Sequence, residues 1–287
     1  MNRLVYTILI LVTTALMGSS FAIGKIGLEF VSPLLLVGLR FTLAGIVMGF
    51  LVIGRPHPHQ LQDWGKIAII GFFQTAGVMG SIFIALRTIT AGETSILLFV
   101  NPLLVVVFGT LFLSAKYRWI QWLGVISGFL GVFITLGFHL QLRLGTWLAL
   151  MGAVSWAIAT LLIKKWSPRF NIWVLTAYQM LFGGILLLIG SFALEDPAIT
   201  FNFTSISVVL WLAIMASVIQ FAIWFFLLEQ GDPGKTSAFL FLAPFFGVLS
   251  GWLLLGETIE WTTLVGGLLI FVGIFLVNWP KTDRKKE

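Results

Sequence analysis

The chain has 287 residues, of which 59% are apolar and only 10% are charged, and its mean hydropathy is +1.05. These values exclude a water-soluble globular protein. The net charge of +6 comes from basic residues scattered along the chain, which excludes the continuous basic stripe of a nucleic-acid-binding protein, and the absence of Cys excludes disulfides and thiolate metal sites.

Apolar stretches of about 20 residues, the length of a helix that crosses a bilayer, recur along the whole chain. They are too long and too evenly apolar for barrel strands, and lipid leaves the backbone no partners outside the helix, so each stretch is expected to be helical. The predicted spans are, in chain order, 4–24, 32–53, 64–87, 92–113, 119–138, 144–165, 172–193, 205–229, 235–255 and 261–279. The sequence therefore predicts an all-α integral membrane protein with ten transmembrane helices.

Basic residues are distributed unevenly between the two sides that these spans define. Lys25, Arg87 and Arg143 lie on one side, and Arg40 lies within a span. The side that carries both chain ends holds Arg3, Arg55, Lys66, Lys116, Arg118, Lys164, Lys165, Arg169, Lys235, Lys281, Arg284, Lys285 and Lys286. Because basic loops stay preferentially in the cytoplasm, both termini are predicted to be cytoplasmic.

An internal repeat covers nearly the whole chain. At an offset of 135, Ser32-Pro33 falls on Ser167-Pro168, and a four-residue insertion near Asn171 then places Arg40 on Gln179. At an offset of 142, eleven residues meet identical partners, among them Gly92 and Trp119. The repeat predicts two five-helix units, residues 1–138 and 142–280, followed by a basic cytoplasmic tail, residues 281–287.

An odd number of spans in each unit decides how the two units are related. The second unit must enter the membrane from the opposite face, so the two are expected to be inverted repeats. Secondary transporters use this plan and place a site near the midplane between the halves, where a central cavity is expected.

Several short motifs of the chain resemble the EamA-type repeat of the drug/metabolite transporter superfamily. They are Gly18 to Lys25, Ser32-Pro33, Leu39 to Ala44, Ala85-Leu86-Arg87 and Ser95 to Pro102 in the first unit, and Trp156, Leu240 to Pro244, Leu253 to Glu257 and Gly266 to Gly273 in the second. The first unit departs from the pattern at Met17, at Glu93, and at Ser114-Ala115, which replaces the Gly-Glu pair of the second unit.

The resemblance implies a bacterial inner-membrane carrier that moves small metabolites, amino acids or drugs, most often outward. It also implies that spans 1–4 and 6–9 enclose the path, while spans 5 and 10 lie at the periphery.

Arg40 is the one charge that lies firmly within a span. An ionisable group at this depth is costly and usually faces the bundle interior or water. Two interpretations are open: a counter-charge for a substrate carboxylate, or a structural hydrogen bond to backbone carbonyls or to Glu93.

Gln74 and Gln220 lie in equivalent spans, one turn apart on the same face, and Trp224 follows one turn after Gln220. The three are candidate substrate-binding residues, with interhelical amide bonding as the structural alternative for the two glutamines. Trp156 and Tyr178 are further candidates that could stack on a ligand, although most aromatic residues here serve packing or face lipid.

Asn101 directly precedes Pro102, and Pro244 occupies the matching position in the second unit. A proline within a span frees a carbonyl and bends the helix, so this pair of interrupted helices indicates a binding site or, alternatively, two packing kinks. Asn101 is a candidate substrate-binding residue, and Arg40, Pro102 and Pro244 are candidates for a gating or structural role.

The predicted function is a secondary transporter that exports a small amphiphilic metabolite by alternating access. The expected partners are the substrate and the bilayer, with proton coupling left open, no metal or other cofactor, and a monomer or a homodimer. A passive channel or facilitator is the alternative, and an intramembrane enzyme is disfavoured because the sequence offers neither a nucleophile with its base nor a metal cluster at depth.

Overall fold

A computed structural model describes residues 3–135, 143–230 and 239–278. Within these residues every predicted span is helical, which confirms the all-α fold, and the one strand-like contact is an isolated antiparallel bridge between Val31 and Ile199. Parts of two predicted spans, residues 136–138 and 235–238, lie outside the described residues, as do residue 279 and the basic tail 281–287.

The first unit begins with α1 (Arg3–Gly27) and α2 (Pro33–Leu51). The third span consists of α3 (Leu61–Gly71), the π-helix η1 (Phe72–Gly77) and α4 (Val78–Ala85). The fourth span is divided into α5 (Ala91–Leu98) and α6 (Asn101–Leu113), and the fifth is α7 (Trp119–Thr135).

The second unit repeats this order. It begins with α8 (Leu144–Trp166), the short 3₁₀ turn η2 (Ser167–Arg169) and α9 (Ile172–Leu194). The eighth span consists of α10 (Phe203–Ala213), the π-helix η3 (Ile214–Ile219) and α11 (Gln220–Gln230). A 3₁₀ turn, η4 (Phe239–Phe241), leads into α13 (Leu242–Leu255), and α14 (Trp261–Val277) is the tenth span.

Length and apolar composition show that these helices cross a membrane. Within the described residues, seven helical stretches of 19 to 26 residues are long and apolar enough to span a bilayer, and three shorter apolar helices, α7, α13 and α14, complete the ten. Large apolar side chains such as Phe50, Phe112 and Phe192 are exposed on the outer surface of the bundle, where acyl chains would surround them. The chain is therefore a multi-pass membrane protein.

The irregular segments occur at matching positions of the two units. The π-helices η1 and η3 start at residues 72 and 214, which are 142 positions apart, the same offset that relates the later parts of the repeat. The fourth span is interrupted at Phe99 and Val100, just before Pro102, and α13 begins two residues before the matching Pro244. These paired departures from the α-helix support the duplicated architecture independently of residue identity.

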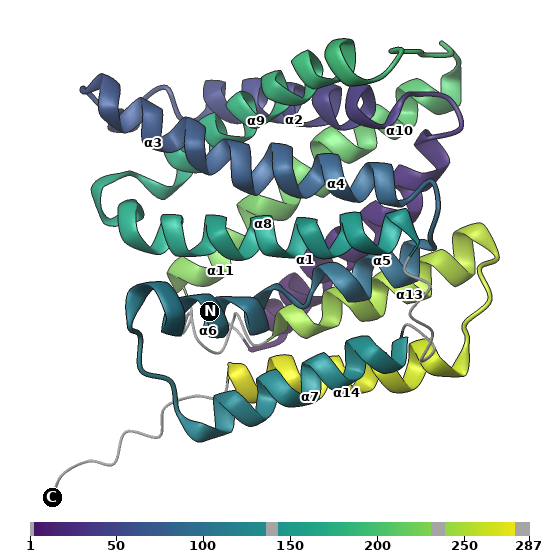
Figure 1. Cartoon of the computed structure of the whole chain (residues 1–287). Helices are drawn as coiled ribbons and strands as arrows, with labels where there is room; N and C mark the ends of the chain where they lie inside the picture. The colour runs from purple at the N-terminus through teal and green to yellow at the C-terminus, as the bar shows by residue number, and fades with distance from the viewer. Residues whose placement is uncertain (1–2, 136–142, 231–238, 279–287) are drawn as a thin grey trace, which may run out of the picture.

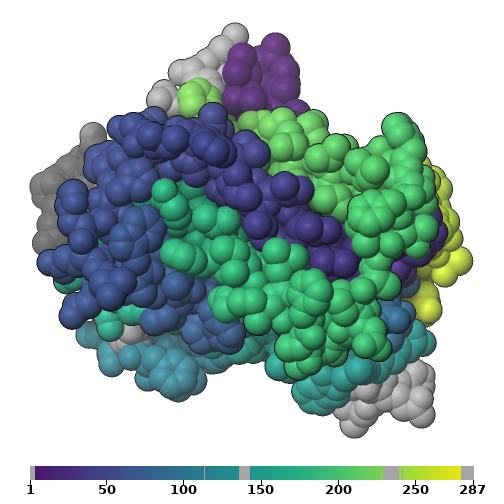
Figure 2. Space-filling view, turned by 90° about the horizontal axis from the view of Figure 1, so that it is seen from above, coloured from purple at the N-terminus to yellow at the C-terminus, as the bar shows by residue number. Residues whose placement is uncertain are grey.

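Helix packing follows the same symmetry (Figure 1). α2 packs along its counterpart α9 at one edge of the bundle, and α7 packs along its counterpart α14 at the opposite edge. α1, α13 and α5 lie between these edges with α8, α4 and α11. Figure 2, a view onto the α2 and α9 edge, shows the two helices side by side on the surface.

Glycines allow both symmetric pairs to approach closely. A Cβ at Gly45 would meet the backbone of Leu181, and a Cβ at the equivalent Gly184 would meet the backbone of Thr42. In the α7–α14 pair, Gly124 lies against Gly273 and Gly131 lies against Gly266. At both interfaces, equivalent glycines of the two halves thus make the same contact in reciprocal directions.

The helices end at two opposite faces of the bundle. The N-terminal face carries the first residues of α1 and the last residues of α8 and α11, and it lies on the left in Figure 1. The Glu257 face carries residues 86–90 and 256–260 and lies on the right.

Candidate functional site

A central cavity of about 360 Å³ lies between the two halves. Its size falls within the range of pockets that hold small molecules, roughly 300 to 1,000 Å³. The lining residues come from spans 1–4, 6, 8 and 9, whereas spans 5, 7 and 10 contribute none of those described, so span 7 departs from the expected enclosure by spans 6–9. They are Met17, Ser20, Phe21, Arg40, Gln74, Val78, Met79, Leu98, Phe99, Trp156, Thr160, Ile163, Ala216, Gln220, Phe221, Trp224, Phe225, Leu228 and Leu240.

Arg40 is held by the π-helix of the other half. Its Nε donates to Ser217 Oγ and its Nη2 donates to the Ala216 carbonyl, both at 2.9 Å. The guanidinium carbon lies 4.6 Å from the centroid of the Phe41 ring, a cation–π contact. These contacts fix the orientation of a side chain that is only 3% exposed.

The third guanidinium nitrogen of Arg40 has no such contact. Nη1 is buried and has no hydrogen-bond partner among the described residues, and none of the described residues that line the cavity is acidic. Glu93, the carboxylate that the sequence offered as a partner, accepts instead from Thr146 Oγ1 at 3.4 Å. Arg40 therefore lines the cavity with a guanidinium that has one buried donor without a partner among the described residues.

The two glutamines at the cavity differ in their contacts. Gln74 lies within η1, and its buried Oε1 has no partner among the described residues. Gln220 lies at the start of α11. Its side-chain Nε2 donates to Thr13 Oγ1 at 3.4 Å, and Thr13 Oγ1 donates to the backbone carbonyl of Gln220 at 3.0 Å. Gln220 thus also serves packing between α1 and α11, whereas Gln74 lines the cavity and has a buried side-chain oxygen that no described residue satisfies.

Aromatic rings form most of the remaining wall. Trp156 of α8 and Phe99 meet edge to face, with ring centroids 5.4 Å apart. Trp224 lines the cavity from α11 together with Phe221 and Phe225, whose ring centroids are 6.1 Å apart. The cavity therefore combines a small polar region at Arg40 and Gln74 with a broad aromatic surface.

Four residues singled out from the sequence lie elsewhere. Tyr178 of α9 packs at the N-terminal face, where its hydroxyl lies 3.3 Å from His57 Nε2 and its ring meets Trp64 edge to face. Asn101 is buried at the start of α6 but does not line the cavity, and neither do Pro102 and Pro244. The break before Pro102 does reach the cavity, because Leu98 and Phe99 line it.

The sequence analysis offered a backbone carbonyl as a partner of Arg40, which Ala216 supplies, but it missed the hydroxyl of Ser217. Ser217 occupies the position in η3 that Thr75 occupies in η1, 142 residues earlier. Thr75 Oγ1 donates to Oε1 of Gln179, the counterpart of Arg40, at 2.7 Å. The signal that could have revealed the pairing is the shared hydroxyl at equivalent positions of the repeat.

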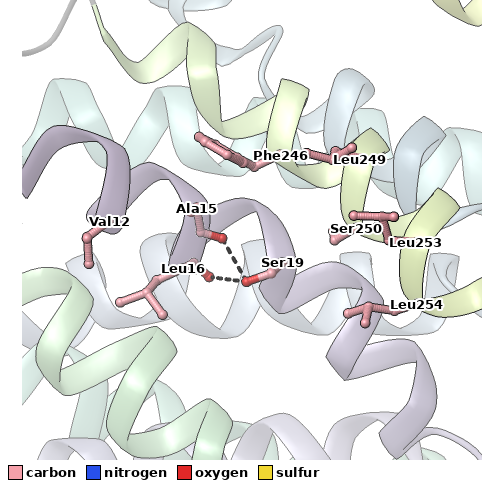
Figure 3. Close-up of a pocket in the computed structure, with 9 residues that line it drawn as sticks. All are labelled: Val12, Ala15, Leu16, Ser19, Phe246, Leu249, Ser250, Leu253 and Leu254. Atoms are coloured by element: carbon pink, nitrogen blue, oxygen red, sulfur yellow. Dashed lines mark hydrogen bonds between the residues drawn. The ribbon is translucent and has the colours of Figure 1, made fainter. Parts of the chain in front are cut away.

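A second hollow, of about 390 Å³, lies between α1 and α13 (Figure 3). Its lining is apolar except for two serines, and the Ser19 hydroxyl donates to carbonyls of its own helix, Ala15 at 2.7 Å and Leu16 at 3.4 Å. The exposed Leu253 and Leu254 form its edge. A groove of this composition suits lipid chains and offers no recognition group for a polar substrate.

A family model for the EamA-like transporter family matches this chain twice, over residues 4–137 and 143–279. The chain belongs to the EamA-like transporter family. This confirms the resemblance of the motifs, and it makes the protein a membrane transporter rather than an enzyme.

Similar proteins cover nearly the whole chain. One is a "Probable amino-acid metabolite efflux pump" of Salmonella typhimurium, 29% identical over 93% of this chain and 93% of that protein. Another is the "Uncharacterized inner membrane transporter YedA" of Escherichia coli, 27% identical over 90% and 86%. A solved structure described only as "Crystal structure of protein" has the same fold, with a TM-score of 0.68 and 22% identity over 94% of this chain and 96% of that chain.

Proposed function

We propose that this EamA-family transporter is a secondary transporter that exports small amphiphilic metabolites such as amino acids by alternating access. The observation that carries the proposal is Arg40 Nη1, a buried donor without a partner among the described residues, at the wall of a cavity between inverted repeats. The name of the Salmonella typhimurium relative supports the same class of substrate.

The chemistry of the cavity suggests how such a molecule is held. A substrate carboxylate accepts from Arg40 Nη1, which relieves the cost of burying the guanidinium unpaired. A substrate amino group donates to Gln74 Oε1, and the apolar part of the molecule packs on Trp156 and Trp224. Gln220 supports this wall through its bonds to Thr13.

The proposal includes the placement of the protein in the membrane. We place it in the bacterial inner membrane with both termini cytoplasmic, because basic residues gather on the N-terminal face. Residues 1–138 and 142–280 form the two repeat units, and residues 281–287 form the basic cytoplasmic tail. The N-terminal face is then the cytoplasmic face.

Counterflow in liposomes tests this function. Purified protein is reconstituted with a panel of unlabelled amino acids inside, and the uptake of each labelled amino acid is measured together with that of a cationic amphiphile. Saturable counterflow of amino acids, weakened roughly tenfold in Gln74→Ala by the loss of a hydrogen bond to a charged group, supports the proposal. Wild-type kinetics in both Gln74→Ala and Gln220→Ala would remove these residues from the site.

A facilitator without ion coupling is the second candidate. It is favoured because no carboxylate lines the described part of the cavity, so the described wall offers no acidic proton carrier. Counterflow that is unchanged by an imposed pH gradient supports the facilitator, whereas accumulation driven by the gradient supports proton coupling. Permeation that does not saturate, at channel-like rates, would instead indicate a channel.

A further inference from the structure

Glu257 holds together three separate parts of the Glu257 face. Its Oε1 accepts from Lys25 Nζ at 2.9 Å and from the Ala91 amide at 2.8 Å, and its Oε2 accepts from the Gly92 amide at 3.2 Å. The carboxylate thus binds the first amides of α5, which no intrahelical carbonyl can satisfy, and pairs with the last turn of α1. Lys25 Nζ also donates to the Ile89 carbonyl at 3.1 Å.

The helices beneath this cluster are tightly packed. Gly18 of α1 lies against the backbone of α13 at Ala243 and Gly247, and Gly247 lies in turn against Ser95 of α5. A Cβ at Gly251 would meet the Glu257 carboxylate itself. The helices α1, α5 and α13 therefore pack in close contact below the Glu257 face.

At the position of the opposite face that corresponds to the start of the 256–260 loop, the backbone conformation is the same but the next residue differs in chemistry. Ser114 and Gly256, which are equivalent in the repeat, both have a left-handed conformation, with φ of 50° and 63°. The residue after each differs, since Ala115 stands where the second unit has Glu257. At the offset of the early part of the repeat, Lys25 corresponds to Thr160, which donates to its own helix and lines the cavity.

The glycines that allow close contact near the Glu257 face are also not repeated at the equivalent positions of the other unit. Gly18 corresponds to Ala153, and Gly247 corresponds to Val105. The counterparts of Ala91 and Gly92 are Pro233 and Gly234, which lie outside the described residues. Among the described residues, the ion pair and its glycine packing thus occur on one of the two faces only.

α5 connects this cluster to the cavity. Its first residues bind Glu257, and its last residue, Leu98, lines the cavity with Phe99, which contacts Trp156. The break at Phe99 and Val100 separates α5 from α6, so α5 can move without carrying α6 with it. A ligand bound to Trp156 would act on the C-terminal end of α5 through Phe99, while Glu257 binds its N-terminal end.

We propose that Lys25, Glu257 and the N-terminal end of α5 form a lock that closes the cavity at the Glu257 face and opens once in each transport cycle. The inference rests on the proposed alternating access. The described residues of the N-terminal face form no ion pair between helices, so opening at the Glu257 face is the step that breaks charge-assisted bonds and the step that substitutions in the lock accelerate.

Accessibility of a single cysteine tests the lock without a known substrate. The chain contains no Cys, so Ser20→Cys, at the cavity wall, gives one reporter whose labelling by a membrane-impermeant maleimide is followed from each face of oriented vesicles. In this background, Glu257→Gln should raise the labelling rate from the Glu257 face roughly tenfold, the factor that corresponds to about 1.4 kcal/mol. Lys25→Met should raise it roughly threefold, because the bonds to α5 remain.

Glu29→Gln is the matched control. It removes the same charge from the same face, but Glu29 is exposed, and it should leave the labelling rate unchanged. If Glu257→Gln fails to reach the membrane, Lys25→Met carries the test. Labelling at the rate of the Ser20→Cys background in both lock variants would overturn the lock.

The same experiment separates this inference from the proposed function. Labelling from one face only in the Ser20→Cys background, unchanged by either lock variant, overturns the lock and leaves alternating access intact. Counterflow that does not saturate, at channel-like rates, overturns alternating access and the lock with it, because a channel is open to both faces at once. An absence of saturable amino-acid counterflow, with labelling that responds to Glu257→Gln, overturns the substrate class and supports the lock.

Discussion

The α2–α9 interface is symmetric between the two repeat units, whereas the polar contacts of the two π-helices beside it are not. At the interface the halves are equivalent, since Gly45 meets Leu181 as Gly184 meets Thr42. At the π-helices they differ, because Arg40 binds Ser217 and Ala216 of η3, whereas Gln179 binds Thr75 of η1. The two units share the glycine packing but differ in the polar residue, which is Arg40 in the first unit and Gln179 in the second. The described part of the cavity therefore receives its positive charge from the first unit only, within a symmetric arrangement of helices.

The largest expected effect is the loss of that charge. Arg40→Gln should lower the transport efficiency for amino acids by roughly 100-fold, since a buried charged pair with the substrate is lost. Arg40→Lys should restore little, because an ammonium cannot bind Ser217, the Ala216 carbonyl and a carboxylate in the fork geometry of a guanidinium. Initial rates of counterflow measure both.

Arg55→Gln is the control for this prediction. Arg55 is exposed between α2 and α3, and its loss changes the net charge equally. If Arg40→Gln transports amino acids as well as Arg55→Gln does, the guanidinium is structural and the charged side of the cavity has no part in binding.

A smaller effect is expected at the symmetric interface. Gly45→Ala should destabilise the protein by about 2 kcal/mol, because the added methyl meets the Leu181 backbone, which cannot move like a side-chain end. Gly49→Ala, one turn along α2, meets nothing within 4 Å and should be neutral or stabilising. Thermal unfolding in detergent compares the two.

Gly184→Ala completes this test. If the interface is symmetric in energy as well as in geometry, its melting temperature should fall as far as that of Gly45→Ala. A shift in only one of the two variants would mean that the halves are equivalent in position alone.

Gln179, the neutral counterpart of Arg40 in the second unit, should matter less for transport than Arg40 does. Gln179→Ala leaves the buried Thr75 hydroxyl without its acceptor and should cost about 1 kcal/mol of stability, with transport within a factor of about three of wild type. Thr75→Val removes the donor, and the double variant should be no less stable than Gln179→Ala alone. A loss of transport as large as that of Arg40→Gln would show that both halves bind substrate equally.

The smallest effect is expected at Tyr178. Its hydroxyl lies near His57 at the N-terminal face, away from the cavity, so Tyr178→Phe should change transport by less than about twofold. A large rise in the Michaelis constant for counterflow, without loss of stability, would place Tyr178 on the substrate path after all.

Hydropathy alone predicted where each helix crosses the membrane, because a helix of about 20 apolar residues matches the thickness of the hydrocarbon core. The repeat then placed Arg40, Gln74, Gln220, Trp156 and Trp224 in facing elements, and all five line one cavity. That they bind substrate stays a prediction. The placement succeeded because inversion fixes which helices face each other.

The direction of side chains on evenly apolar helices was less predictable. α9 carries little contrast between its faces, so the sequence did not show that Tyr178 points to His57 rather than to the cavity. The π-helices were missed because one extra residue in a turn leaves hydropathy unchanged. The pairing of Arg40 with Ser217 depends on that turn, so it too needed coordinates.

The α7–α14 pair has a consequence for how the halves move. Gly124 faces Gly273 and Gly131 faces Gly266, and exchange of the two halves converts one contact into the other. These glycine contacts therefore stay the same when the two halves exchange roles. Under the proposed alternating access, spans 5 and 10 would stay packed together while the other eight spans move relative to them.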